Sequence, residues 1–143
     1  MGKKTKVVID TNVIILAFGW HGKPEEIVKL ATAGSGRVKN FISLEMLAEL
    51  RNVVAYPKFN FSETLQAEII ETVFSVSSIT IVNESVNVMA VDPPDNRVLE
   101  CAVSANVDFI ISGDKHLLNL KNFRGREIFS PEEFLSKLRD NLC

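Results

Sequence analysis

The sequence predicts an α/β protein built around a mainly parallel sheet. Three observations favour this class. Short runs rich in β-branched residues alternate with longer stretches of helical periodicity. The first run, Val7–Ile9, is continuously apolar, as in a buried parallel strand. No repeat, low-complexity tract or linker interrupts the alternation, so we expect the 143 residues to form a single domain over 1–143.

Five strands and the helices between them follow from local patterns. The predicted strands are Lys6–Ile9, Val38–Ile42, Ile79–Val82, Phe109–Ile111 and a short Glu127–Phe129. Helices are predicted where start and stop signals bound an apolar stripe: from Pro24 to the Gly34–Gly36 stretch, from Leu44 to about Val54 after Ser43, from Glu63 to about Val76 after Ser62, after Asp95, and from Pro131 after Ser130.

The composition is that of an ordinary globular protein, with 46% hydrophobic and 24% charged residues. No segment is long and apolar enough to span a membrane, and the N-terminus lacks the apolar core of a signal peptide, so we expect a cytoplasmic protein without a membrane partner. Cys101 lies in a helical apolar pattern and Cys143 is terminal, which predicts neither a disulfide nor a thiolate metal site. The net charge of −2 argues against a general polyanion binder, although basic residues gather after Asp114.

Acidic residues recur where the predicted strands end. Asp10 ends the first strand, Asp114 follows the fourth by two residues, and Asp95 lies in the proline-stiffened turn Asp92–Asn96. Glu49 lies on the helix after the second strand. Open α/β sheets bind ligands beyond the carboxyl ends of their strands. If strands one and four are neighbours, we expect Asp10 and Asp114 to lie side by side there.

Each acid also has a simpler interpretation. Asp10, Asp95 and Asp114 each precede or begin a predicted helical stretch and are suitable N-caps. Glu49 fits a solvated helix face, where Glu45 one turn earlier competes with it. Asp92 fits a turn residue better than a ligand.

A cluster of carboxylates is stable only when cations neutralise it, because like charges destabilise one another. Oxygen ligands without histidine or cysteine favour Mg²⁺ or Mn²⁺ over Zn²⁺. Such sites hydrolyse phosphodiesters, with the cation activating a water molecule and stabilising the leaving oxygen. The pattern therefore predicts a metal-dependent phosphodiesterase.

The same residues resemble a known family. Asp10-Thr11-Asn12 after an apolar strand, Glu49-Leu50 on a helix, Asp95 opening a helix and Ser112-Gly113-Asp114 after a strand are similar to the PIN domain, in the branch of VapC-like toxins of toxin–antitoxin systems. The resemblance covers roughly residues 7–130. It implies a three-layer α/β/α fold with a five-stranded sheet in the order 3-2-1-4-5, and Mg²⁺- or Mn²⁺-dependent cleavage of RNA by an endoribonuclease.

The resemblance also implies roles for individual residues. The proposed catalytic and metal-binding acids are Asp10, Glu49, Asp95 and Asp114; the supporting hydrogen-bond donors are Thr11, Asn12 and Ser112; and the phosphate-binding residues are Arg97, Lys115 and His116. An antitoxin protein is an implied partner. The oligomeric state is open, since the apolar residues of the Val53–Phe61 region suit either a homodimer contact or packing against the following helix. Trp20 suits base stacking, a lid or a dimer contact.

Two other function classes share part of this pattern. A haloacid-dehalogenase-like phosphatase also uses an Asp after its first strand, but it needs a second Asp two residues later, where this chain has Asn12. A catalytically silent RNA-binding or protein-interaction module is the alternative function. The retained set of four acids argues against it, since a site without metal gains from losing clustered charge.

Overall fold

The computed structural model describes residues 4–31, 37–87 and 93–141. Its elements are β1 (Thr5–Ile9), α1 (Thr11–Gly19), α2 (Gly22–Leu30), β2 (Val38–Ser43), α3 (Leu44–Val53), the 3₁₀ turn η1 (Pro57–Phe59), α4 (Glu63–Val76), β3 (Ser77–Thr80), α5 (Pro93–Ala105), β4 (Phe109–Ile111), α6 (Lys115–Leu120), β5 (Asn122–Phe123), β6 (Arg126–Phe129) and α7 (Pro131–Asn141). No helix in these ranges is long and apolar enough to cross a membrane.

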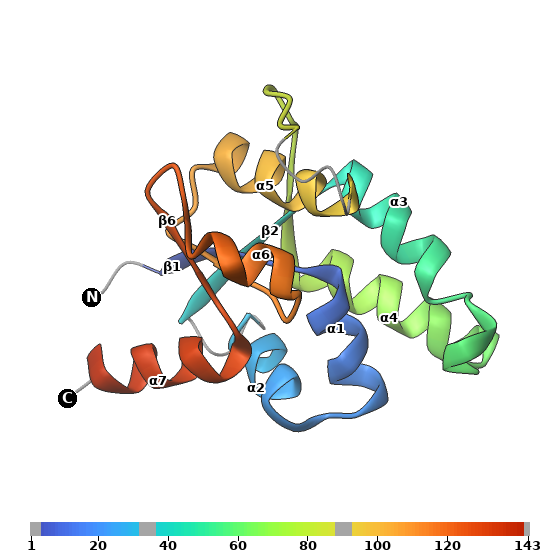
Figure 1. Ribbon diagram of the computed structural model, residues 1–143. Helices are drawn as coiled ribbons and strands as arrows, with labels where there is room; N and C mark the ends of the chain where they lie inside the picture. The colour runs from blue at the N-terminus through green and yellow to red at the C-terminus, as the bar shows by residue number, and fades with distance from the viewer. Residues whose placement is uncertain (1–3, 32–36, 88–92, 142–143) are drawn as a thin grey trace.

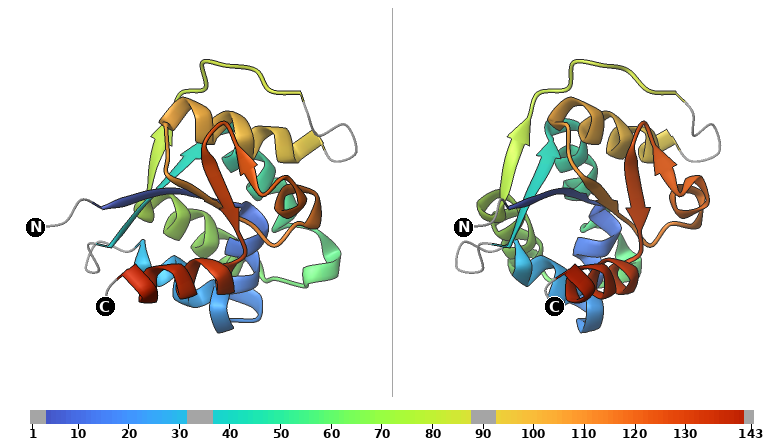
Figure 2. Two further views of the ribbon diagram at one scale, coloured as in Figure 1. Left: turned by 60° about the vertical axis from the view of Figure 1, so that its left-hand side comes forward. Right: turned by 90° about the vertical axis from the view of Figure 1, so that its left-hand side faces the viewer.

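The sheet has the order β3-β2-β1-β4-β6-β5 and is parallel except for the last pair. It is covered on both faces (Figure 1), with α5 and the start of α3 on one side and α1, α2, α4 and α7 on the other (Figure 2). The predicted α/β/α class and the neighbouring positions of the first and fourth strands are therefore confirmed. The predicted order 3-2-1-4-5 is also found, with β6 in the fifth place.

The predicted strand count is wrong, because the sheet has six strands and not five. The additional strand, β5, has only two residues and pairs antiparallel with β6 through a two-residue turn. Arg124 and Gly125 in this turn both have positive φ, 50° and 90°. That combination matches the twist of a tight hairpin, and glycine reaches it without strain.

Two further elements differ from the prediction. β3 lies at Ser77–Thr80, two residues before the expected run, and Ile81 beyond it is exposed. α1 has only one signal in the sequence, the capping interpretation of Asp10. Its side chains are buried on most of its circumference, including Val13, Ile14 and Ile15, so it lacks the one-sided stripe by which a helix is found in a sequence.

A buried asparagine ties the first three strands together just before the end of β1. Asn40 on β2 is 1% exposed. Its Oδ1 accepts a hydrogen bond from the Ile9 N–H at 2.9 Å, and its Nδ2 donates to Ser77 Oγ on β3 at 2.8 Å. The side chain continues the ladder where the main-chain pairing of β1 with β2 has ended at Val7. This contact fixes the strand end from which Asp10 follows.

Candidate active site

The register of β1 against β4 decides which side chains meet at the carboxyl edge of the sheet. Ile9 pairs with Ile111, so Asp10 and Ser112 leave their strands at the same level. The Ser112 hydroxyl donates to Asp10 Oδ2 at 2.7 Å, and neither residue is more than 3% exposed. Parallel pairing thus places a hydroxyl donor directly against the first carboxylate.

Asp10 also begins α1. Its Oδ1 accepts a hydrogen bond from the Asn12 N–H at 3.2 Å, in the manner of an N-cap. The backbone N–H of Asp10 donates to the Ile111 carbonyl at 2.8 Å. The carboxylate is therefore oriented by a helix on one side and by the neighbouring strand on the other. Asp10 therefore both caps α1 and lies at the carboxyl edge of the sheet.

Asp114 is linked to Asp10 through Ser112. The register sets Ser112 beside Asp10, and Asp114 follows two residues later. The Asp114 N–H donates to the Ser112 hydroxyl at 3.0 Å, so the serine links the two acidic segments. Asp114 Oδ1 accepts from the His116 N–H at 2.7 Å and caps α6.

A cavity of about 210 Å³ opens beyond the ends of the strands. Three carboxylates from three elements line it: Asp10 after β1, Glu49 on α3 and Asp95 in the first turn of α5. Asp10 and Asp95 are buried, and Glu49 is half-buried. Glu45, the competing acid on α3, is exposed and outside the lining of this cavity.

The other predicted site residues divide between the cavity and its surroundings. Thr11, Asn12 and Arg97 line it. Ser112 and Asp114 do not, although Ser112 donates a hydrogen bond to Asp10 and Asp114 is bonded to Ser112 in turn. Lys115 and His116 lie on α6, outside the lining. Asp92 lies outside the described residues.

A buried acid that the sequence patterns did not single out holds Arg97. Glu100, one turn along α5, is 2% exposed. Its carboxylate accepts from the Arg97 guanidinium at 2.9 Å and from the Val86 N–H at 2.9 Å. The segment after β3, which passes over α5 in Figure 2, is tied to the helix by this contact. The i, i+3 spacing of Arg97 and Glu100 is a signal that was available in the sequence.

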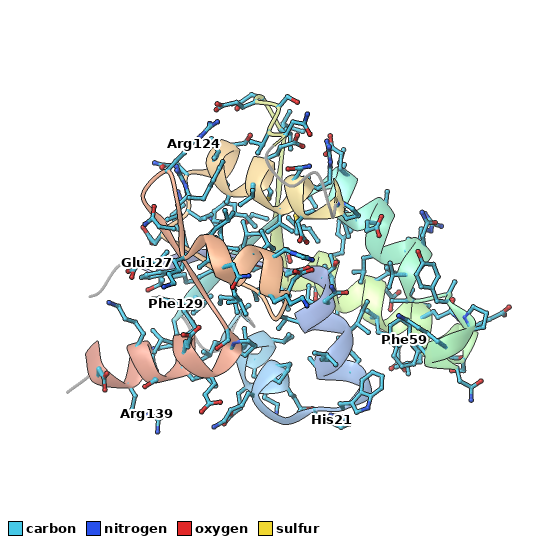
Figure 3. The ribbon with its side chains drawn as sticks, in the orientation of Figure 1. His21, Phe59, Arg124, Glu127, Phe129 and Arg139 are labelled. Atoms are coloured by element: carbon cyan, nitrogen blue, oxygen red, sulfur yellow. The ribbon has the colours of Figure 1, made fainter. Side chains whose placement is uncertain are left out.

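One wall of the cavity comes from the connection between α3 and α4. Tyr56, Lys58 and Phe59 line the cavity there. Figure 3 shows Phe59 at this connection, on the side toward α1. The apolar pattern of this segment suits a dimer contact or packing against the following helix, and nothing in it indicates a place beside the carboxylates.

The donor set of the cavity suits a hard divalent cation, since it offers carboxylate oxygens and neither thiolate nor imidazole. The carboxylates line one cavity, but they are not close enough together to form a metal-binding cluster. Within residues 4–31, 37–87 and 93–141, no three acidic, histidine or cysteine side chains stand close enough to hold a cation as placed.

Comparison with known proteins gives a family and a fold. The sequence model of the family described as the PIN domain matches residues 6–116. No curated protein matches the chain. Two solved structures share the fold at 13% sequence identity. One, VapBC2 from Rickettsia felis bound to a DNA fragment from its promoter, has a TM-score of 0.63 over 88% of this chain and 98% of that chain. The other, PAE2754 from Pyrobaculum aerophilum, has a TM-score of 0.56 over 96% of this chain and 91% of that chain.

Proposed function

Because the chain belongs to the PIN domain family, we propose that it is a Mg²⁺- or Mn²⁺-dependent endoribonuclease that hydrolyses RNA phosphodiester bonds. One observation carries the proposal: Asp10, Glu49 and Asp95 come from three separate elements and line one cavity at the carboxyl edge of a parallel sheet. That is the edge where this class of sheet binds ligands. Asp114, whose N–H donates to the Ser112 hydroxyl, is the fourth acid of the proposed set.

The four carboxylates would hold the cation, which when bound lowers the pKa of a water molecule and stabilises charge on phosphate oxygens. Asp10 is oriented by two donors, the Ser112 hydroxyl and the Asn12 N–H. Glu49 is half-buried on a helix and has more freedom to turn. We expect these acids to draw together only when their charge is neutralised.

Three cationic or ionisable side chains would bind the phosphates of the substrate. Arg97 is in the cavity lining, where Glu100 orients its guanidinium. Lys115 and His116 lie on α6, next to the capping carboxylate of Asp114. They suit contacts to the RNA strand as it leaves the cavity.

The first experiment is cleavage of labelled single-stranded and hairpin RNA in Mg²⁺ or Mn²⁺ and in EDTA. We expect Asp10→Asn to lose at least about 100-fold activity, since even a residue that only supports a metal ligand is typically worth 10–100-fold. Asp140→Asn, an exposed acid on α7, is the charge-matched control. Cleavage that persists in Asp10→Asn would refute this site, and metal-dependent binding without cleavage would favour a catalytically silent RNA-binding module.

Glu49 and Glu45 provide a second matched pair on one helix. Glu49→Gln should lower both activity and cation affinity, because only Glu49 lines the cavity. Glu45→Gln should change neither. Equal effects of the two substitutions would remove Glu49 from the proposed set.

The proposed biological role is that of a toxin paired with an antitoxin protein. Its support is the shared fold with the VapBC2 structure. Growth arrest on expression of the chain, relieved by the product of an adjacent gene that copurifies with it, would support the role. Harmless expression with intact ribonuclease activity would favour RNA processing.

A further inference from the structure

The connection between α3 and α4 brings an aromatic and cationic wall to the carboxylate cavity. Tyr56, Lys58 and Phe59 line the cavity that Asp10, Glu49 and Asp95 also line. Tyr56 is 45% exposed. The Lys58 ammonium lies 5.1 Å from the centroid of the Phe59 ring. The wall therefore combines ring surface with a positive charge.

This wall is held in place from behind by further aromatic contacts. Phe59 stacks on Phe61 with centroids 5.4 Å apart and an angle of 12° between the rings. Trp20, at the end of α1, meets Phe59 edge-on at 6.1 Å. Gly19 permits this packing, because a Cβ there would lie 3.3 Å from Cζ of Phe61. The rings come from two segments that are far apart in the sequence.

We propose that Tyr56, Lys58 and Phe59 form a nucleobase subsite for the nucleotide next to the phosphate held at the carboxylates. The inference rests on the proposed nuclease function and extends it to a part of the substrate. A phosphate with an unpaired base attached presents an anion and a flat ring at once. Lys58 and Arg97 match the anion, and the exposed ring of Tyr56 matches the base.

The chemistry of the wall favours a nucleotide over an apolar protein segment. Three carboxylates and two cationic side chains line the same cavity as the rings. An apolar side chain entering it would remove these charges from water without pairing them. A stacked base leaves its polar edge free for water and brings its own phosphate to the cations. A base in a duplex has no free face, so the subsite selects unpaired RNA.

The experiment compares two oligomers of ten nucleotides with the same phosphates, one of uridine and one abasic. Binding is measured by fluorescence anisotropy in EDTA and again in Ca²⁺, so that it does not depend on cleavage. The wild-type protein should bind the uridine oligomer about tenfold or more tightly than the abasic one, the range expected for a stacked base. The chain contains one tryptophan, and its emission reports a ligand that reaches Phe59.

Substitutions then assign the effect to the wall. Tyr56→Ala should remove most of the preference for the uridine oligomer, and Tyr56→Phe should retain it because the ring remains. Lys58→Ala should weaken both oligomers alike. Phe74→Ala is the control and should change nothing, because Phe74 is an aromatic on α4 that is 59% exposed and lies outside the cavity.

Several results would overturn the inference. Equal binding of the two oligomers, no binding of either, or an unchanged preference in Tyr56→Ala would each do so. A dimer seen by analytical ultracentrifugation that Tyr56→Ala dissociates, with RNA binding unchanged, would assign the wall to a second copy of the chain. Base-dependent binding without metal-dependent cleavage would refute the nuclease function and support the subsite. Metal-dependent cleavage without base-dependent binding would support the nuclease function and refute the subsite.

Discussion

Removal of the Ser112 hydroxyl tests whether the hydrogen bond between the two central strands supports the proposed site. In Ser112→Ala, Asp10 Oδ2 loses a donor at 2.7 Å and the Asp114 N–H loses an acceptor at 3.0 Å. A hydrogen bond to a charged group contributes about 1.5–3 kcal/mol and a neutral one about 0.5–1.5 kcal/mol. We expect a loss of about 2–4 kcal/mol in the free energy of unfolding, and a Tm lower by roughly 4–16 °C.

Activity should fall by about 10–100-fold, as for other residues that orient a metal ligand. The assays are urea denaturation and RNA cleavage, the latter well below the Tm of the variant. Ser112→Thr keeps the hydroxyl and should retain most of both quantities, which separates the hydrogen bond from simple crowding at this fully buried position. A Ser112→Ala protein with wild-type stability and wild-type cleavage would refute the reasoning.

Three further predictions concern buried polar groups. Asn40→Ala leaves the N–H at the end of β1 without its acceptor, so urea denaturation should show a loss of about 1–3 kcal/mol, and an unchanged midpoint would contradict this. Arg97→Ala removes the guanidinium from the buried Glu100 carboxylate. Arg97→Ala should lower the free energy of unfolding less in a Glu100→Gln background than in the wild-type protein. Strictly additive losses in this double-mutant cycle would disprove a coupling between Arg97 and Glu100. Burial raises the pKa of the Cys101 thiol from 9.0 to about 12. With the terminal cysteine replaced by serine, the folded protein should not react with a disulfide reagent at pH 8. Because the pKa is higher in the folded state, the stability linked to this thiol is complete below pH 9 and is lost as the pH rises toward 12, which denaturation across that range would measure.

The elements that the sequence predicted well are those with local boundary signals. Ser43 and Ser62 cap α3 and α4 through hydrogen bonds from the Met46 and Leu65 N–H groups, at 3.1 and 3.0 Å. α4 has the predicted bounds, Glu63–Val76. A cap and an amphipathic stripe lie within a few residues of each other, so neither needs information from the rest of the chain.

The elements that the sequence predicted weakly or not at all depend on distant parts of the chain. α1 lies in the interior, so its sequence is a nearly continuous apolar run that includes Val13-Ile14-Ile15. Such a run does not distinguish a buried helix from a buried strand. β5 has no strand pattern of its own. It forms because it pairs with β6. Tertiary packing determines both α1 and β5, and this information is not contained in any short stretch of the sequence.

The same distinction applies to the candidate site. The alternation of strands and helices predicts which edge of the sheet Asp10 and Asp114 occupy, and Asp10 lines the cavity there whereas Asp114 does not. Only the register shows that Ser112 lies between them. The contribution of Tyr56 and Lys58 to the cavity depends on how the α3–α4 connection folds back, which no local pattern encodes.

The capping and ligand interpretations of Asp10 differ in what they require of the side chain. An N-cap needs one oxygen acceptor, and asparagine supplies it about as well as aspartate. A cation site in a shared cavity needs the negative charge. Asp10→Asn therefore keeps the acceptor for the Asn12 N–H and removes the charge opposite Glu49 and Asp95. A variant that folds normally and has lost cleavage would show that the charge matters beyond the cap. A variant with unchanged stability and unchanged cleavage would leave Asp10 as a cap alone.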